Sequence, residues 1–241
     1  MTTMIVPNIR ASIGRSEALH LVELMGRHDP EAHASARAQL EADGLDSLLD
    51  DPRVLNAVLT ERRVNVRPEL VFYVLVRQAL LERGVDDSGT ADYVASLLVQ
   101  FGERKRAYRI SADGEAEYGY LVDLVARLGE ARGSEAFLIR AHMGNFSLWL
   151  TGLFPDFLEA RVQRRGAPPA SYYEQMGASG YRAASEAPEA ASLGVRNVLT
   201  SMATHFAGVR SALNRLSDRH LWRGGGHPLG RLLREVGYAF D

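Results

Sequence analysis

Residues 193–220 read LGVRNVLTSMATHFAGVRSALNRLSDRH, and their apolar side chains recur at alternating steps of four and three. This spacing predicts one long α-helix whose apolar face packs nearly parallel to a neighbouring helix. A bundle within the chain and a coiled-coil dimer both fit the pattern. The bundle is favoured because no second long heptad segment is present. If the protein self-associates through this helix, the candidate interface residues are Met202, Phe206, Val209, Leu213 and Leu216.

Helical signals extend over the rest of the chain. Asp29-Pro30 and Asp51-Pro52 each place a capping carboxylate before a proline at the first helical position, which predicts helices that begin there. Apolar periodicity predicts further helices over residues 68–83, 88–106, 118–128, 134–154 and 170–186. Convincing strand alternation is absent from the sequence. The predicted fold class is therefore all-α, a helical bundle of about eight to ten helices.

Three of these helices carry more specific expectations. Ser88 or Thr90 is expected to cap the helix over 88–106. The helix over 134–154 is apolar on nearly every side beyond Ala141, which is typical of a buried central helix. The amphipathic helix over 118–128 is defined by its apolar residues, Tyr118, Leu121, Val122, Val125 and Leu128.

Turn signals divide the chain into three predicted units. Residues 111–114 indicate a turn between a short-helix subdomain over 1–110 and a helical bundle over 111–221. Residues 224–226 are three consecutive glycines and indicate a hinge. The third unit, 222–241, is this hinge followed by a terminal helix that Pro228 begins.

The composition excludes several classes of protein. The 241 residues include no cysteine, which removes disulfides, thiolate nucleophiles and cysteine-bound metals. The net charge of −2 gives no long-range field that would gather nucleic acid or an anionic membrane. The longest uncharged run, 141–155, is shorter than the roughly 20 residues that span a bilayer. The N-terminus lacks the apolar core of a signal peptide, so we expect a cytoplasmic protein without a membrane span.

The sequence contains no arrangement of residues that a known reaction requires. Glu17 and His20 form the one Glu-x-x-His pair, whereas a di-iron bundle needs two such pairs and further glutamates. The seven histidines are scattered, and no Gly-x-Ser-x-Gly nucleophile motif is present. We therefore predict no catalytic residue, no metal site and no cofactor.

His142 is the most informative candidate for ligand binding. It shares a face of the predicted central helix with Asn145 and Trp149, at steps of three and seven residues. Buried polar groups need hydrogen-bond partners, so His142 and Asn145 are expected to bond to neighbouring helices. The favoured interpretation is a buried polar network that fixes the register of the helices. The alternative is a pocket for a small molecule or haem with His142 as its ligand or anchor.

A second candidate cluster combines tyrosines with glycines on the helix over 170–186. Glycine inside a helix costs roughly 1 kcal/mol relative to alanine, and close approach of another group usually offsets that cost. Close packing against Gly144 or Gly152 is the favoured explanation, and a flat cofactor between the aromatic rings is the alternative. The candidate residues are Tyr172, Tyr173, Met176, Gly177 and Tyr181, with Gly180 beside them.

About forty residues in the middle of the chain resemble a family of bacterial proteins. The matching residues are Gly144-Asn145, Ser147-Leu148, Thr151-Gly152, Phe154-Pro155, Tyr172-Tyr173, Met176-Gly177 and Tyr181. The resemblance implies a bacterial helical protein. It brings no activity, cofactor or catalytic residue, but it suggests that His142, Asn145 and the glycine–tyrosine cluster belong to one structural unit.

Three functions follow from these observations, in order of preference. The first is a non-enzymatic scaffold or protein-interaction module that binds another protein or itself, through the helix over 193–220 or the terminal segment. The second is a helical bundle that binds a small molecule or haem-type cofactor around His142. The third is a DNA-associated regulator using Arg104 to Arg109, although acidic residues balance these charges and argue against nucleic acid as a partner.

Overall fold

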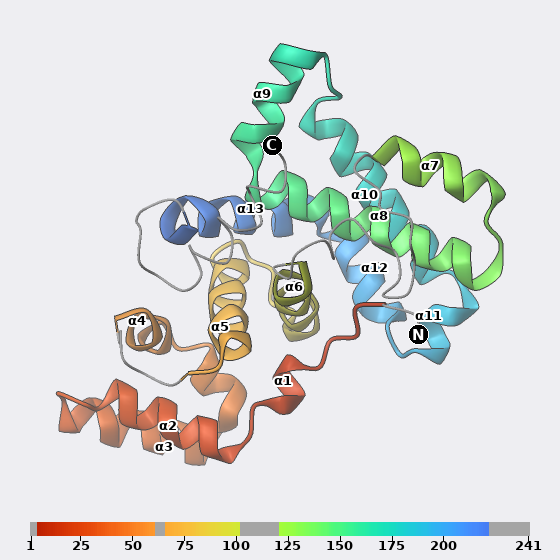
Figure 1. Cartoon of the computed structure of the whole chain (residues 1–241). Helices are drawn as coiled ribbons and strands as arrows, with labels where there is room; N and C mark the ends of the chain where they lie inside the picture. Colours follow the sequence, from red (N-terminus) through yellow and green to blue (C-terminus); the bar gives the residue numbers. More distant parts are fainter. Residues whose placement is uncertain (1–3, 61–65, 102–120, 222–241) are drawn as a thin grey trace.

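The computed structural model describes residues 4–60, 66–101 and 121–221, and these ranges form helices and no strand. The predicted all-α class is therefore confirmed (Figure 1). In the described residues no helix has the length and apolar character of a membrane span. The elements are α1 (Ile9–Ser12), α2 (Arg15–Met25), α3 (Pro30–Leu49), α4 (Pro52–Thr60), α5 (Pro68–Leu81), α6 (Ser88–Phe101), α7 (Leu121–Glu130), α8 (Gly133–Leu153), α9 (Pro155–Arg165), α10 (Ala170–Ser185), α11 (Pro188–Ser192), α12 (Arg196–Thr204), α13 (Phe206–Leu216) and a π-helical turn η2 (Ser217–Leu221).

Several predictions lie outside the described residues. These are the turn over 111–114, the hinge over 224–226 with its terminal helix, and the basic cluster from Arg104 to Arg109.

Carboxylate caps begin the early helices as the Asp-Pro pairs predict. The Asp29 side chain accepts from the backbone N–H groups of Glu31 and Ala32, and Pro30 is the first residue of α3. The prediction that Ser88 or Thr90 caps α6 was wrong, because its cap is Asp87. One Asp87 oxygen accepts from the amides of Gly89 and Thr90, at 2.9 and 3.2 Å. This is the ordinary geometry of an aspartate N-cap, and it places Ser88 inside the helix.

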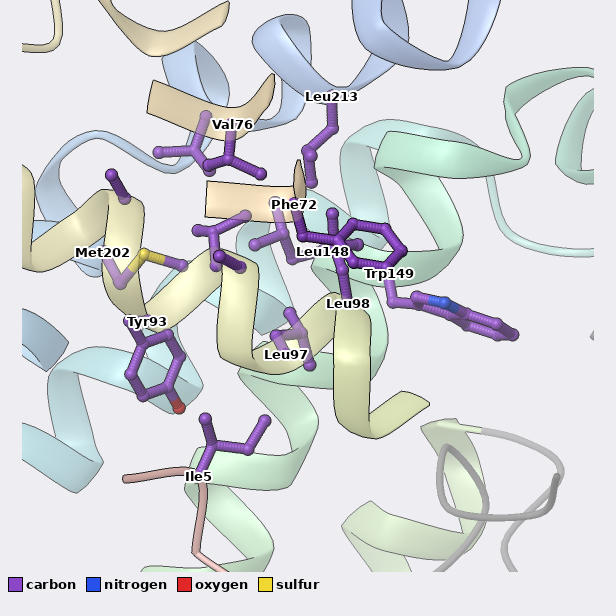
Figure 2. Packing of buried hydrophobic residues seen from close by; sticks show 14 of the residues in the cluster. Ile5, Phe72, Val76, Tyr93, Leu97, Leu98, Leu148, Trp149, Met202 and Leu213 are labelled. Carbon is purple, nitrogen blue, oxygen red and sulfur yellow. The ribbon is translucent and has the colours of Figure 1, made fainter. Parts of the chain in front are cut away.

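Three helices are buried on nearly every side and form the centre of the molecule. They are α5, α6 and α8, and Figure 1 shows α2, α3 and α4 beyond α5 at one end. In Figure 2, Phe72 of α5, Leu98 of α6 and Leu148 of α8 face a common interior. The buried apolar residues form a continuous cluster that includes residues before and after the gap at 102–120.

The helix predicted over 193–220 is divided into α12, α13 and η2. His205 between α12 and α13 has φ −101° and ψ 16°, outside the helical region. The Thr200 and Thr204 hydroxyls donate to the carbonyl oxygens four residues earlier, at 3.0 and 2.9 Å, and such bonds bend helices. The apolar periodicity contains no information about this bend, because it reports only which side chains are buried.

The apolar face of this segment is filled within the chain. α12 packs against α10 and α6, and α13 packs against α8 and α5. The residues predicted to mediate self-association are buried in these contacts: Met202, Phe206, Val209, Leu213 and Leu216. Their five side chains therefore lie inside the described fold and offer no free surface to a second subunit.

The last turn of α8 receives its hydrogen bonds from α13 and η2. The Asn214 amide nitrogen donates to the carbonyl oxygens of Thr151 and Gly152, at 2.8 Å each. The Ser217 hydroxyl donates to the Leu153 carbonyl oxygen at 3.0 Å. The terminal carbonyls of a helix have no partner inside it, so these side chains satisfy groups that α8 leaves open.

Candidate functional site

His142 and Trp149 lie in a cluster of aromatic side chains along α8. The His142 ring lies 5.8 Å from the Phe101 ring and 6.5 Å from the Phe146 ring, centre to centre. Trp149 is fully buried and meets the Phe154 ring edge-on at 4.8 Å. The tilted contact with Phe101 and the edge-on contact with Phe154 are preferred arrangements of aromatic rings. His142 is buried and contacts Phe101 of α6 and Phe146 of its own helix, α8.

Asn145 connects three helices through one oxygen atom. Its side-chain carbonyl accepts hydrogen bonds from the phenols of Tyr93 on α6 and Tyr181 on α10, at 2.8 and 2.9 Å. A carbonyl oxygen has two lone pairs, so both acceptor positions are used. Burial raises the pKa of both phenols well above the ordinary value, so they remain protonated donors. Asn145 thus bonds to two neighbouring helices, and its partner Tyr93 is one that spacing could not identify. The participation of His142 in this network stays a prediction.

The glycines of α8 and α10 allow these two helices to approach closely. A Cβ atom at Gly180 would lie 2.6 Å from the Arg140 carbonyl oxygen of α8. A Cβ atom at Gly177 would lie 2.6 Å from the Phe206 ring and 2.8 Å from the Ser147 Cβ atom. A Cβ atom at Gly144 would lie 2.5 Å from the Tyr181 ring. Protein atoms thus occupy the space beside these glycines, as expected for close helix packing.

The remaining predicted ligand residues lie in the first half of α10. Tyr172 is 37% exposed, whereas Tyr173 is buried and Met176 is partly buried. The eight predicted ligand residues are therefore divided among several environments. His142 and Trp149 belong to the aromatic cluster, Asn145 and Tyr181 to the polar network, and Gly177 to the helix crossing.

The described part of the chain places no three histidine or acidic side chains together as a metal site.

Sequence reasoning missed the carboxylates that connect distant segments. The Arg77 guanidinium binds Asp50 through two hydrogen bonds of 2.7 Å and Asp86 through a third of 2.6 Å. Asp92 on α6 accepts from the backbone N–H groups of Ile9 and Arg10, at 2.9 and 3.1 Å. Asp50 is 27 residues from Arg77, and Asp92 is 83 and 82 residues from Ile9 and Arg10, so no local motif marks these contacts.

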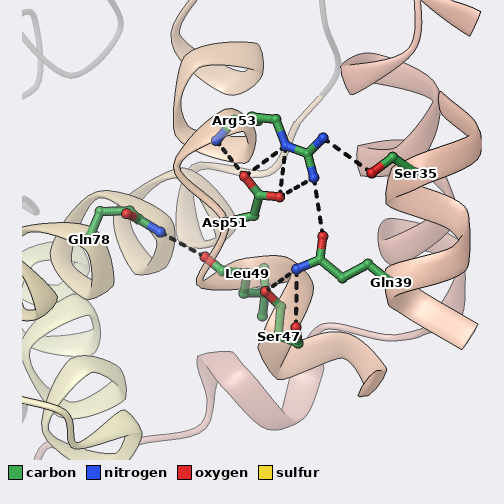
Figure 3. Close-up of polar contacts among 7 residues, drawn as sticks. All are labelled: Ser35, Gln39, Ser47, Leu49, Asp51, Arg53 and Gln78. Carbon is green, nitrogen blue, oxygen red and sulfur yellow. Dashed lines mark hydrogen bonds and ion pairs between the residues drawn. The ribbon is translucent and has the colours of Figure 1, made fainter. Parts of the chain in front are cut away.

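A second polar network connects α3 with the start of α4 (Figure 3). The Arg53 guanidinium binds Asp51, and it also reaches Ser35 and Gln39 of α3 at 3.4 Å. The Gln39 amide nitrogen donates to the Ser47 carbonyl and hydroxyl oxygens at 3.0 Å each. The Arg53 side chain is 47% exposed, so solvent screens this network. Its geometry is that of a surface connection between helices.

The described surface includes an uncovered apolar strip on α7. Val122 is 64% exposed and Val125 is 39% exposed, whereas Leu121 and Leu124 are buried towards the body. Ala126 and Gly129 are also exposed and continue the strip at helical spacing. Val122 and Val125, which help to define the predicted amphipathic helix, are exposed because the apolar arc of α7 is wider than the surface that α8 covers. We call Val122, Val125, Ala126 and Gly129 the α7 strip.

Charged side chains flank the α7 strip. Arg127 pairs with Glu130 at 3.3 Å and also with Glu135 of α8, and its side chain is 44% exposed. Asp123 is exposed one helical turn before Arg127. The strip is thus an apolar surface with a polar border, the usual composition of a protein-binding patch.

Comparison of the chain with family models, with curated proteins and with solved structures gives no match. The resemblance of residues 144–181 to a bacterial helical family therefore stays a prediction.

Proposed function

We propose that this protein is a helical protein-interaction module that self-associates through the α7 strip. The observation that carries the proposal is the exposure of Val122, which at 64% is larger than that of any other large apolar side chain in the described residues. Water contact with such a side chain is unfavourable, and a partner surface would remove it. The neighbouring Val125, Ala126 and Gly129 extend the contact over two helical turns.

The proposal moves the predicted self-association to a different surface. The face of α12 and α13 is filled by the chain's own helices, whereas α7 lies on the outside and packs mainly on α8 (Figure 1). The cofactor-binding alternative around His142, the DNA-binding alternative and the cytoplasmic location stay predictions. None of them draws support from the geometry of the described residues.

The test is the molar mass of the purified protein as a function of concentration. Light scattering and sedimentation from about 10 μM to about 1 mM should give a monomer that becomes a dimer. Val122→Glu places a charge in the strip and should raise the dissociation constant at least about tenfold. Leu193→Glu is a matched control, because Leu193 is 43% exposed and lies outside α7. A wild-type protein that stays monomeric throughout, or equal effects of both variants, would contradict the proposal.

A further inference from the structure

We infer that residues 4–13 form a strap that docks on α5 and α6 as a bound peptide does, and that leaves them while these helices stay folded. The surface under the strap is then a binding site for a peptide with isoleucine at every fourth residue, and the chain's own N-terminal segment is its occupant. The inference does not depend on the α7 strip or on self-association.

Three isoleucines of the strap recur at every fourth residue and are buried. Ile5 is 2% exposed, and Ile9 and Ile13 are 4% exposed each. Val6, between the first two, is 44% exposed. α1 contains Ile9 and packs against α5 and α6, and in Figure 2 the Ile5 side chain points towards α6. The strap thus has one covered apolar side and one side in contact with solvent, as a peptide with apolar anchors has on a receptor surface.

A carboxylate of α6 holds the backbone of the strap. One oxygen of Asp92 accepts from the N–H groups of Ile9 and Arg10, at 2.9 and 3.1 Å. Asp92 is 8% exposed, so these two amides take the place of water around a nearly buried carboxylate. The Arg10 guanidinium also pairs with Asp46, but the Asp46 side chain is 66% exposed and solvent screens that contact. The site therefore recognises two adjacent backbone amides beside the central isoleucine.

The strap has the structure of a separable segment. Within it, the Ser12 amide donates to the Asn8 carbonyl oxygen at 3.1 Å. The hydrogen bonds described between the strap and the body run through side chains of the body. These are Asp92 and Arg67, whose guanidinium donates to the Ser12 carbonyl oxygen at 3.1 Å. When the strap opens, α5 and α6 keep their contacts with each other and with α13 and α12, so opening costs less free energy than global unfolding.

Cysteine labelling tests the opening, since the chain contains no cysteine of its own. Ile9→Cys in the strap and Val94→Cys in α6 are separate full-length variants, and both positions are buried. Urea unfolding first gives the global stability of each variant. Below the unfolding transition, position 9 should react with a thiol reagent at least about tenfold faster than position 94. Its rate should also change little with urea, because local opening exposes little surface.

The opposite result is clear in the same measurement. If both positions react at the rate and with the urea dependence of global unfolding, the strap leaves only when the whole fold is lost. That outcome would overturn the inference.

Asp92 provides a second readout in the Ile9→Cys protein. Asp92→Ala removes the acceptor of two strap amides and should raise the labelling rate at position 9 about tenfold. Asp87→Ala is the matched control, because Asp87 binds the start of α6 and Ser201. It should lower the global stability and leave the rate at position 9 unchanged. Equal increases in the two variants would show that Asp92 does not hold the strap, and would contradict the inference.

A synthetic peptide of residues 4–13, blocked at both ends, tests the binding site itself. At about 1 mM it should raise the labelling rate of the Ile9→Cys protein at least about twofold, because it occupies the opened site and keeps the strap out. The same peptide with Ile9→Asp places a carboxylate at the central anchor and should have no effect. A rate that neither peptide changes, or that both change equally, would show that the surface is not a peptide site. None of these outcomes alters the molar mass of the wild-type protein, by which self-association is measured.

Discussion

The described residues before the gap at 102–120 and those after it are connected in different ways. Residues 4–101 are joined by carboxylates that bind partners far away along the chain. Asp50 binds Arg77, 27 residues later, and Asp92 binds the Ile9 amide, 83 residues earlier. Residues 121–221 are joined by close helix contact at Gly180 and by neutral hydrogen bonds such as that of Asn145. The first kind of contact depends on charge, and the second depends on volume and shape. The two regions should therefore respond to different perturbations.

The largest effect is expected at the crossing of α8 and α10. Gly180→Ala places a methyl group 2.6 Å from the Arg140 carbonyl oxygen, so the backbones must separate. Overpacking of this kind costs about 3 kcal/mol of unfolding free energy, measurable by urea denaturation. Gly129→Ala in α7 is the matched control, because nothing lies within 4 Å of its added Cβ atom. At low protein concentration it should stabilise the protein by up to about 1 kcal/mol. Equal effects of both variants would show that the crossing is not tightly packed.

Removal of the shared acceptor in the polar network should have the next largest effect. Asn145→Leu leaves the Tyr93 and Tyr181 phenols buried without their partner, at a cost of about 2 to 3 kcal/mol. Adding Tyr93→Phe and Tyr181→Phe removes both phenols and should recover about half of the loss. Urea unfolding of the single and triple variants measures this. If the triple variant is less stable than Asn145→Leu alone, the three side chains do not form one network.

In the first region, the corresponding test removes a charge. Arg77→Met keeps most of the buried volume and takes away the partner of Asp50 and Asp86, at a cost of about 2 kcal/mol. The carboxylates are partly exposed, at 33% and 78%, so the cost is lower than for a fully buried pair. Arg53→Met should cost less than about 1 kcal/mol, since that side chain is 47% exposed. Equal losses in the two variants would mean that burial does not distinguish these arginines.

The smallest effects are expected in the dependence of stability on pH. Burial alone would raise the pKa of Asp87, but hydrogen bonds from Ser201, Thr90 and Gly89 outweigh it and leave the pKa below its ordinary value. The stabilisation from Asp87 is therefore present above the unfolded pKa of about 4 and is lost as the pH falls through the lower folded value. The pKa of Asp92 is instead shifted above its ordinary value. Burial raises its pKa, and the amides of Arg10 and Ile9 offset only part of that change.

The contribution of Asp92 to stability changes with pH in the opposite direction to that of Asp87. Because the folded pKa of Asp92 is raised, its contribution is fully present below the unfolded pKa and is lost as the pH rises through the folded value. Between pH 3 and pH 7, the advantage of wild type over Asp87→Asn should grow with pH, and that over Asp92→Asn should shrink. Tyr181→Phe should show no trend over this range, because its phenol stays neutral. If the stability differences for Asp87→Asn and Asp92→Asn changed with pH in the same direction, the opposite pKa shifts of the two aspartates would be contradicted.

The sequence predicts the parts of this fold that depend on local chemistry. The Asp-Pro pairs mark the starts of α3 and α4, since a capping carboxylate and its target amides are two or three residues apart. The continuous apolar run marks α8 as the central helix. α9 was missed because Pro155 ends one helix and also begins the next, and a proline alone does not distinguish the two.

The candidate site depends on contacts that local pattern does not contain. Asn145 could be identified as buried and in need of a partner, but Tyr93 is 52 residues earlier and nothing in the spacing selects it. Val122 and Val125 are apolar like their buried neighbours, and only the position of α8 decides which of them is covered. Burial is a property of the assembled helices, so the sequence could name the apolar arc of α7 but not its exposed edge.

The carboxylate of Asp92 also has a consequence for the order of folding. α1 has only 4 residues, too few to form a stable helix alone, and the side chain that caps it lies 83 residues away. The first turn therefore gains this cap only when α6 is in place, and we expect the N-terminal segment to join the fold after α6. Hydrogen–deuterium exchange at the Ile9 amide would then report its contact with α6, a distant helix, through a single proton.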